Sequence, residues 1–110
     1  MRQYTNKSQT AKLIELGFEE PCSIASVEPI YGMGGISVAK AYSIGELIEM
    51  LPKEITNAGL ANILSIYIDH NKMWMVEYSD FLGELLSTYR TELIDALYDM
   101  IVKLKEEGVI

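Results

Sequence analysis

The sequence predicts an α+β fold, in which a small antiparallel sheet is built on a central hairpin at about residues 60–79. Two runs rich in Ile, Leu, Tyr, Trp and Val, residues 60–68 and 73–78, flank a short polar stretch and indicate this hairpin. Apolar residues at helical spacing predict three helices, which we expect to pack mainly on one face of the sheet, at about residues 5–16, 43–51 and 91–107. A chain of 110 residues is the size of one domain, which we expect to span residues 1–110.

The first helix carries signals mainly at its end. Gly17 followed by Phe18 is typical of a helix stop with a hydrophobic contact after it. The sequence does not decide at which residue this helix begins, because three residues near its start are all good N-caps: Thr5, Asn6 and Ser8. The second helix begins with a capping box from Ser43 to Glu46 and ends before Pro52. We expect residues 53–59 to form the turn that follows this helix.

The helix at residues 91–107 has the clearest pattern. Its apolar residues recur three and four positions apart and form one stripe: Leu93, Leu97, Met100, Ile101 and Leu104. Thr91 is placed to cap the first turn, and Gly108 can adopt the left-handed conformation that ends the helix. This helix therefore needs an apolar surface to lie on.

We interpret residues 69–72 as a loop of even length, which fixes the register of the central hairpin. One face then holds Leu64, Ile66, Ile68, Met73, Met75 and Glu77, and the other holds Ile63, Ser65, Tyr67, Trp74, Val76 and Tyr78. Both faces are largely apolar, so we expect cover on both sides. Helices would cover the aliphatic face, and residues 23–41 or another protein chain would cover the aromatic face.

Two segments are harder to interpret. Residues 23–41 contain strand-forming residues on both sides of the turn Gly32-Met33-Gly34-Gly35, which predicts an irregular hairpin. The glycine-rich turn lacks the spacing and the following Lys-Ser or Lys-Thr of a phosphate loop, so we interpret it as a turn. Residues 80–90 fit either a helix or an irregular connector that packs on the sheet.

Composition narrows the class of protein. Sixteen acidic and nine basic side chains give a net charge of −7, which argues against direct binding to nucleic acid. The single cysteine, Cys22, cannot form an internal disulfide and favours a reducing cytoplasm. The longest apolar runs are far shorter than a membrane span, and we expect no membrane partner.

Few residues suggest catalysis, so we lean against an enzyme and predict no catalytic residue, cofactor or metal. His70, the only histidine, is expected to be exposed in the hairpin loop, and Cys22 to be a small, half-buried residue. Glu77 falls at one end of the aliphatic face in the assumed register, where either the strand end is wet or a basic group such as Lys53 or Arg90 meets the carboxylate.

The most suggestive set of residues is aromatic. Tyr67, Trp74 and Tyr78 share one face in the assumed register. Such clusters are usually core, but tyrosine and tryptophan also suit exposed contact surfaces. These three residues are therefore our candidate interaction surface.

The order of motifs resembles a family of short uncharacterised proteins encoded in gut Bacteroidetes genomes, often among phage-derived or mobile-element genes. The resemblance lies in Leu13 with Leu16-Gly17, Tyr42-Ser43-Ile44 through Leu47 to Leu51-Pro52, Leu60, Val76-Glu77-Tyr78, and Ile94-Asp95-Ala96 onward to Lys103-Leu104. It implies a bacterial or phage origin and supplies no activity and no site residue.

Three functions follow from these observations. The first is a non-enzymatic cytoplasmic protein that binds another protein or forms a homo-oligomer. The alternative is a small-molecule binder or enzyme with a site beside the sheet that uses Glu77, His70, and Tyr67 or Tyr78. The second alternative is an acidic nucleic-acid mimic that inhibits a host enzyme, which the net charge of −7 suggests.

Overall fold

The computed structural model describes residues 1–30 and 34–110. Its three helices are α1 (Lys7–Glu15), α2 (Ile44–Met50) and α3 (Leu93–Glu106). Its strands are β1 (Ile24–Ile30), β2 (Gly35–Lys40), β3 (Glu54–Asn57), β4 (Leu60–Ile68), β5 (Trp74–Asp80) and β6 (Gly83–Arg90). The predicted α+β class is confirmed. Part of the predicted glycine turn, residues 31–33, lies outside the described residues.

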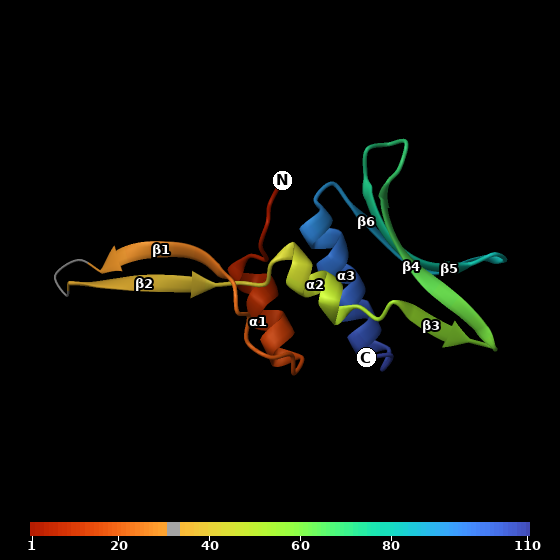
Figure 1. Ribbon diagram of the computed structural model, residues 1–110, viewed down its shortest axis with the longest axis horizontal. Helices are drawn as coiled ribbons and strands as arrows, with labels where there is room; N and C mark the ends of the chain where they lie inside the picture. The colour runs from red at the N-terminus through yellow and green to blue at the C-terminus, as the bar shows by residue number, and fades with distance from the viewer. Residues whose placement is uncertain (31–33) are drawn as a thin grey trace.

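The strands form two separate antiparallel sheets. β3, β4, β5 and β6 pair in chain order as a four-stranded meander, and β1 pairs only with β2. Figure 1 shows the β1–β2 hairpin, which we call the arm, reaching away from the helices while the larger sheet lies on their other side. The predicted hairpin at residues 23–41 is thus confirmed, but it does not cover the larger sheet.

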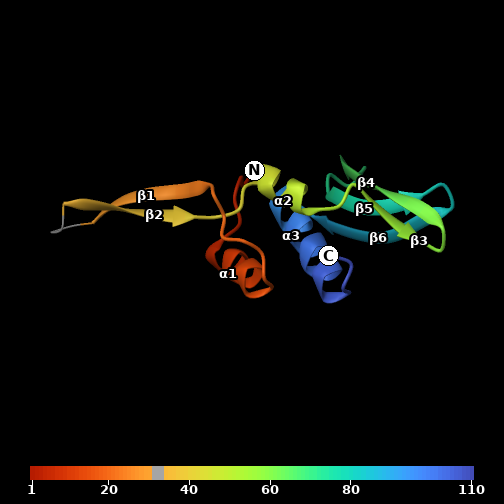
Figure 2. The same cartoon turned by 60° about the horizontal axis from the view of Figure 1, so that its bottom comes forward.

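The helices lie on one side of the four-stranded sheet, as predicted (Figure 2). α3 packs directly on β5 and β6, and α2 packs on α3. α1 adds Leu13 to the same core and is joined to α3 by a hydrogen bond of 2.7 Å from Gln9 Nε2 to Asp95 Oδ1. The predicted stripe of α3 is fully or almost fully buried: Leu93, Leu97, Met100, Ile101 and Leu104.

The predicted register of the central hairpin is wrong by one residue. Ile68 pairs with Trp74 and Leu64 with Tyr78, because the loop between the strands has an odd length. The backbone N–H of Lys72 donates to Asp69 O (3.0 Å), the N–H of Asp69 donates to Met73 O (2.9 Å), and Lys72 adopts a left-handed φ of 61°. This three-residue turn replaces the even loop assumed from the sequence.

The shift of one residue exchanges the two faces of β5 relative to β4. The inner face, toward α3, now holds the larger apolar side chains: Leu64, Ile66, Ile68, Trp74, Val76 and Tyr78. The outer face alternates between polar and apolar residues and no other element of the described chain covers it: Ile63, Ser65, Tyr67, Met75, Glu77 and Ser79. Residues 23–41 therefore do not supply the second cover, and cover by another protein chain stays a prediction. Within the described chain this sheet has one dry and one wet face.

Three further expectations are corrected. Residues 83–90 form strand β6 and not a helix or connector, and residues 54–57, expected as part of a turn, form strand β3. Helix α3 starts one residue later than expected, with Glu92 as its N-cap, and no side chain caps it, so Thr91 does not have the predicted role. The box from Ser43 to Glu46 is present as predicted.

Candidate interaction surface

The arm carries apolar side chains along one of its two faces. Val27 pairs with Val38, so both lie on the same face, and Ile36 is two residues before Val38 on β2. A bulge between Ile24 and Ser26 brings Ile24 onto this face as well, opposite Lys40. We call Ile24, Val27, Ile36 and Val38 the arm face. The opposite side holds small or polar residues such as Ser26 and Ala39.

The arm face is open to solvent. The exposed fraction is 55% for Val27, 67% for Ile36 and 44% for Val38. A two-stranded hairpin alone is at best marginally stable in water, and contiguous exposed apolar side chains are typical of contact surfaces. The arm face is therefore a candidate contact surface.

Hydrogen bonds fix the base of the arm to the helices. The Ala41 N–H donates to Ser23 O (3.1 Å), and the Tyr42 N–H donates to Thr5 Oγ1 (3.0 Å). The Glu46 carboxylate on α2 accepts from the Cys22 N–H (3.1 Å) and from the Ser23 hydroxyl. Burial alone would raise the pKa of Glu46, but the hydrogen bonds from Ser23, Ser43 and Cys22 outweigh it and hold this pKa below its ordinary value of 4.5. The arm is thus anchored at its base, where Val38 and Lys40 also line an open groove of about 420 Å³ together with Thr10 and Ile14 of α1.

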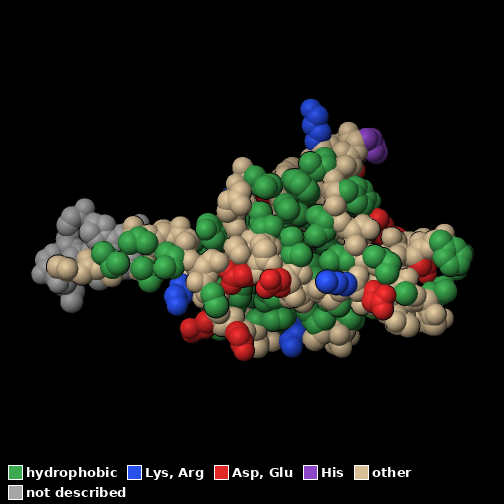
Figure 3. Space-filling view, viewed as in Figure 1, with side chains coloured by type: hydrophobic (Ala, Val, Ile, Leu, Met, Phe, Trp, Pro, Cys, Tyr) green, Lys and Arg blue, Asp and Glu red, His purple; other side chains and the backbone are tan. Residues whose placement is uncertain are grey.

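A second apolar surface lies on the body of the molecule. Where α3 does not cover the inner face, Ile68 is 53% exposed, and Leu64, Ile66 and Trp74 are half-buried. Ile48 of α2 is also exposed. Figure 3 shows hydrophobic side chains gathered over α2 and the neighbouring part of the sheet. We call Ile48, Leu64, Ile66, Ile68 and Trp74 the body patch.

The aromatic residues singled out in the sequence do not form one surface. Tyr78 is fully buried on the inner face, where its hydroxyl donates to Pro52 O (2.7 Å), and Trp74 is half-buried beside it. Tyr67 lies on the outer face in one row with Met75 and Tyr89 and is 40% exposed. The predicted grouping is wrong because it depended on the register. A contact role for Tyr67 or Trp74 separately stays a prediction.

The residues proposed for a site beside the sheet do not converge either. Tyr78 lies on the inner face, Glu77 and Tyr67 lie on the outer face, and His70 is exposed at the tip of the β4–β5 loop, as expected for a loop histidine. Partial desolvation raises the pKa of Tyr67, and the negative charge of nearby Glu77 raises it further. Glu77 is opposite Ser65 and Ser87 in mid-strand and not at a strand end. Arg90, one of its two suggested partners, pairs with Asp99 instead (2.8 Å).

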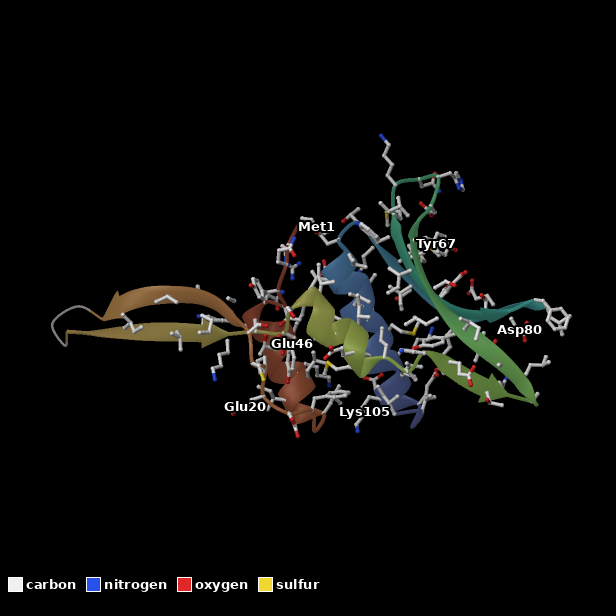
Figure 4. All side chains as sticks on the ribbon, in the orientation of Figure 1. Met1, Glu20, Glu46, Tyr67, Asp80 and Lys105 are labelled. Atoms are coloured by element: carbon white, nitrogen blue, oxygen red, sulfur yellow. The ribbon has the colours of Figure 1, made fainter. Side chains whose placement is uncertain are left out.

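A cleft that the sequence did not reveal lies between the end of α1 and α2. Its volume is about 470 Å³, and it is lined by Phe18, Glu19, Glu20, Cys22, Tyr42, Glu46, Glu49 and Met50. Figure 4 shows Glu20 and Glu46 near α1 and α2, far from Tyr67 on the sheet. Burial raises the pKa of Tyr42, with Glu46 and Glu20 adding to the effect. The glutamates that line the cleft give it a negative charge, which favours cations over anions.

Metal and thiol chemistry have little support in the described residues. No group of three or more His, Cys, Asp or Glu side chains in residues 1–30 and 34–110 is arranged to hold a metal ion. Cys22 is exposed, not half-buried as expected, and lies at the base of the arm. None of the helices in the described part of the chain has both the length and the apolar character needed to cross a membrane.

Comparison with known proteins leaves the fold and its surfaces as the basis for function. No family model matches the chain, and neither the curated proteins nor the solved structures include a match.

The arm face was missed at the level of sequence because its pattern is interrupted. Val27, Ile36 and Val38 alternate with small or polar neighbours, which is the signal of an amphipathic strand pair. The bulge at Ile24 and Ser26 breaks this alternation, and the glycine turn hides which residues lie opposite each other. Pairing the two strands so that Val27 lies opposite Val38 would have revealed the arm face from the sequence.

Proposed function

We propose that this protein is a non-enzymatic protein-binding or self-associating module and that the arm face is its binding surface. The observation that carries the proposal is the exposed, one-sided apolar face of an arm that is anchored only at its base. None of the arm residues whose side chains the structure describes belongs to the core cluster of the body. The arm exposes apolar side chains without contributing to the core, and a contact with another chain is the best explanation for such an element.

Burial on a partner would stabilise the arm as well as the complex. Moving a fully exposed valine or isoleucine side chain out of water contributes about 1.5–3 kcal/mol. Each residue of the arm face is about half exposed, so four of them offer about 3–6 kcal/mol before the costs of association. Because association itself costs about 4–15 kcal/mol, the arm face would be one part of a larger contact.

The proposal is tested by making the arm face polar. The double substitution Val27→Ser with Val38→Ser removes apolar surface at one cross-strand pair, while Ser26→Ala, on the opposite side of β1, is the matched control. Self-association is measured by light scattering, and binding to other proteins by pull-down from the native host. We expect the double variant to lose whichever association the wild type makes and the control to keep it. No association of either kind, or an association that the double variant retains, would contradict the proposal.

The other functions stay predictions. On the face in Figure 3, acidic side chains are scattered with Lys and Arg among them, which does not favour a nucleic-acid mimic there. A ligand site around Glu77, His70 and Tyr78 has no support from the sheet register, since these residues do not share a face. Cytoplasmic location and an origin in Bacteroidetes or phage-derived genes are expectations from the sequence.

A further inference from the structure

The cleft between the end of α1 and α2 has a partly apolar lining that is held in place. Phe18, Tyr42 and Met50 all line it; Tyr42 is buried, and Phe18 and Met50 are half-buried against the core. The Tyr42 hydroxyl donates to Glu19 O, which fixes the ring. The volume of about 470 Å³ lies within the range of about 300–1,000 Å³ that is typical of small-molecule sites. The cleft is therefore large enough to hold a small organic ligand.

Four carboxylates set the charge that such a ligand needs. Glu19, Glu20, Glu46 and Glu49 line the cleft, and no lysine or arginine is among the described residues that line it. Neither of the two salt bridges in the described part of the chain involves them. Burial alone would raise the pKa of Glu46, but the hydrogen bonds that it accepts outweigh burial and keep this carboxylate ionised near neutral pH. A ligand of this cleft is therefore a cation.

The spread of the carboxylates distinguishes an elongated cation from a metal ion. Although four glutamates and Cys22 line one cleft, no three acidic, His or Cys side chains in residues 1–30 and 34–110 are close enough to hold a metal ion. Calcium and magnesium need several oxygen ligands at about 2.0–2.6 Å from one point. An elongated organic cation can instead place separate charges beside separate carboxylates and lay its alkyl chains on the apolar lining.

An ammonium group of the chain itself already contacts an aromatic ring of the cleft. Lys105 Nζ lies over the Phe18 ring, 5.4 Å from its centroid, which is within the distance of about 6 Å for a cation–π contact. Lys105 comes from α3 and is not among the residues that line the cleft, so it does not fill the cleft. The lining thus includes a ring that is placed to attract an aliphatic ammonium group.

We propose that this cleft binds an aliphatic cation in which two or more ammonium groups are joined by short alkyl chains. Glu19, Glu20 and Glu49 bind the ammonium groups, and Phe18 and Met50 contact the alkyl chains. A free polyamine and the lysine side chains of a partner protein both offer this chemistry. The site goes beyond the proposed function, since none of its residues belongs to the arm face.

Titration calorimetry of the full chain with two cations of equal charge tests the choice of ligand. Spermidine and hexaamminecobalt(III) carry the same charge near neutral pH, but only spermidine has alkyl chains. We expect spermidine to bind at least about fivefold more tightly, because its alkyl chains contact the apolar lining. Equal affinities, or tighter binding of hexaamminecobalt(III), would show a response to charge alone and would overturn the proposal.

Paired substitutions test where the cation binds. Glu20→Gln with Glu49→Gln removes two charges from the cleft, and the matched control, Glu54→Gln with Glu84→Gln, removes two exposed charges from the larger sheet. We expect the cleft pair to raise the Kd for spermidine at least about tenfold and the control pair to raise it less than about threefold. All four positions are exposed, and circular dichroism checks that each variant is folded. Equal effects of the two pairs would overturn the site.

A second pair of probes separates the two sources of ammonium groups. Spermine and a tetralysine peptide with blocked ends carry the same number of ammonium groups. Tighter binding of spermine assigns the cleft to a free polyamine, and tighter binding of tetralysine assigns it to the lysine side chains of a partner. In either titration we expect the backbone amide NMR signals of Glu20 and Cys22 to shift and that of Tyr67 to stay unchanged. Binding of neither probe, or binding that leaves the cleft signals unchanged, would overturn the proposal.

The arm variant separates this site from the proposed function. Val27→Ser with Val38→Ser leaves the cleft intact, so we expect it to bind spermidine with the Kd of the wild type. Loss of spermidine binding in this variant would overturn the cleft as an independent site. A wild type that binds no polyamine but loses its protein association on these arm substitutions would overturn the cleft site and leave the proposed function standing.

Discussion

Three polar side chains make hydrogen bonds that hold the body together. The Tyr78 hydroxyl donates to Pro52 O (2.7 Å), which ties the middle of the sheet to the segment between α2 and β3. The Thr88 hydroxyl donates to Ala96 O (2.7 Å) and ties β6 to α3. The buried amide of Asn62 donates to the carbonyls of Ile55 and Leu60, which stabilises the edge hairpin. Each bond satisfies a polar group that would otherwise be costly to bury.

The Tyr78 hydroxyl predicts a specific dependence of stability on pH. Burial raises the pKa of Tyr78 from 10.0 to about 12. The folded protein therefore holds this proton at pH values where the unfolded chain has lost it. Its contribution to stability is complete below pH 10 and is lost as the pH rises from 10 toward 12.

Tyr78→Phe tests this assignment by denaturant unfolding at several pH values. We expect the variant to be about 1 kcal/mol less stable at pH 7, because the Pro52 carbonyl loses its donor. We also expect a shallower fall in stability above pH 10 than in the wild type. Tyr89→Phe, on the exposed outer face, is the matched control. Equal slopes for the wild type and Tyr78→Phe would contradict the assignment.

Short local motifs fix the elements of this fold. The Ser43 hydroxyl and the Glu46 carboxylate satisfy each other's backbone N–H groups at the start of α2. At the end of α1, the Phe18 N–H bonds back to Leu13 O (3.2 Å), with Gly17 at a φ of 100°. The turn between β3 and β4 places two residues, Ala58 and Gly59, at positive φ. Such turns match the twist of a hairpin but are strained at any residue with a Cβ.

The strain at Ala58 can be relieved. Its φ of 52° is left-handed, and asparagine tolerates this region better than alanine. We expect Ala58→Asn to stabilise the protein by about 0.5–1 kcal/mol in thermal or denaturant unfolding. Ala61→Asn, at an exposed position within β4, should give no gain, because asparagine is disfavoured in strands. A loss of stability from Ala58→Asn would show that this turn is assigned incorrectly.

The Glu46 carboxylate predicts how the base of the arm responds to acid. The hydrogen bonds that it accepts lower its pKa below 4.5, so its contribution to stability is present above that value and is lost as the pH falls through the folded pKa. We expect Glu46→Gln to cost about 1 kcal/mol at pH 7, because the amide cannot accept from all three donors. We also expect it to flatten the loss of stability on acidification.

Glu49→Gln is the matched control for Glu46, since it is exposed on the same helix. In dilute solution it should change stability by no more than about 0.5 kcal/mol. The measurement is denaturant unfolding from pH 7 down to pH 3. If both variants behave like the wild type, the carboxylate of Glu46 does not hold the arm base.

The elements that the sequence predicted correctly are those with local signals. The capping box at Ser43, the glycine at position 17 and the stripe of α3 depend on residues within one or two turns. Strand β6 was missed because a bulge between Tyr78 and Ser79 disturbs its pairing and its residues do not alternate. The predicted register was wrong because it depended on whether Met73 belongs to the strand or to the loop. Placing Met73 in the strand put Trp74 and Tyr78 on the same face as Tyr67, whereas in the structure they lie on the opposite face.

The whole molecule is more extended than a compact domain of its size. Its radius of gyration is 16.4 Å, compared with about 13 Å expected for 110 residues. The excess is explained by the arm, which reaches away from the helices and shares no core with them (Figure 1). The outer face of the larger sheet is wet, whereas one face of the arm is apolar and exposed. We therefore expect a partner to bind the arm.

Hydrogen–deuterium exchange of the arm amides tests the claim that the arm face binds another chain. In dilute solution we expect the β1 and β2 amides to exchange quickly, because an isolated hairpin is only marginally stable. On addition of the partner, whether a second copy or a captured host protein, we expect their exchange to slow by at least about tenfold while β5 is unchanged. Arm amides that exchange at the same rate in the free and the associated protein would contradict the account.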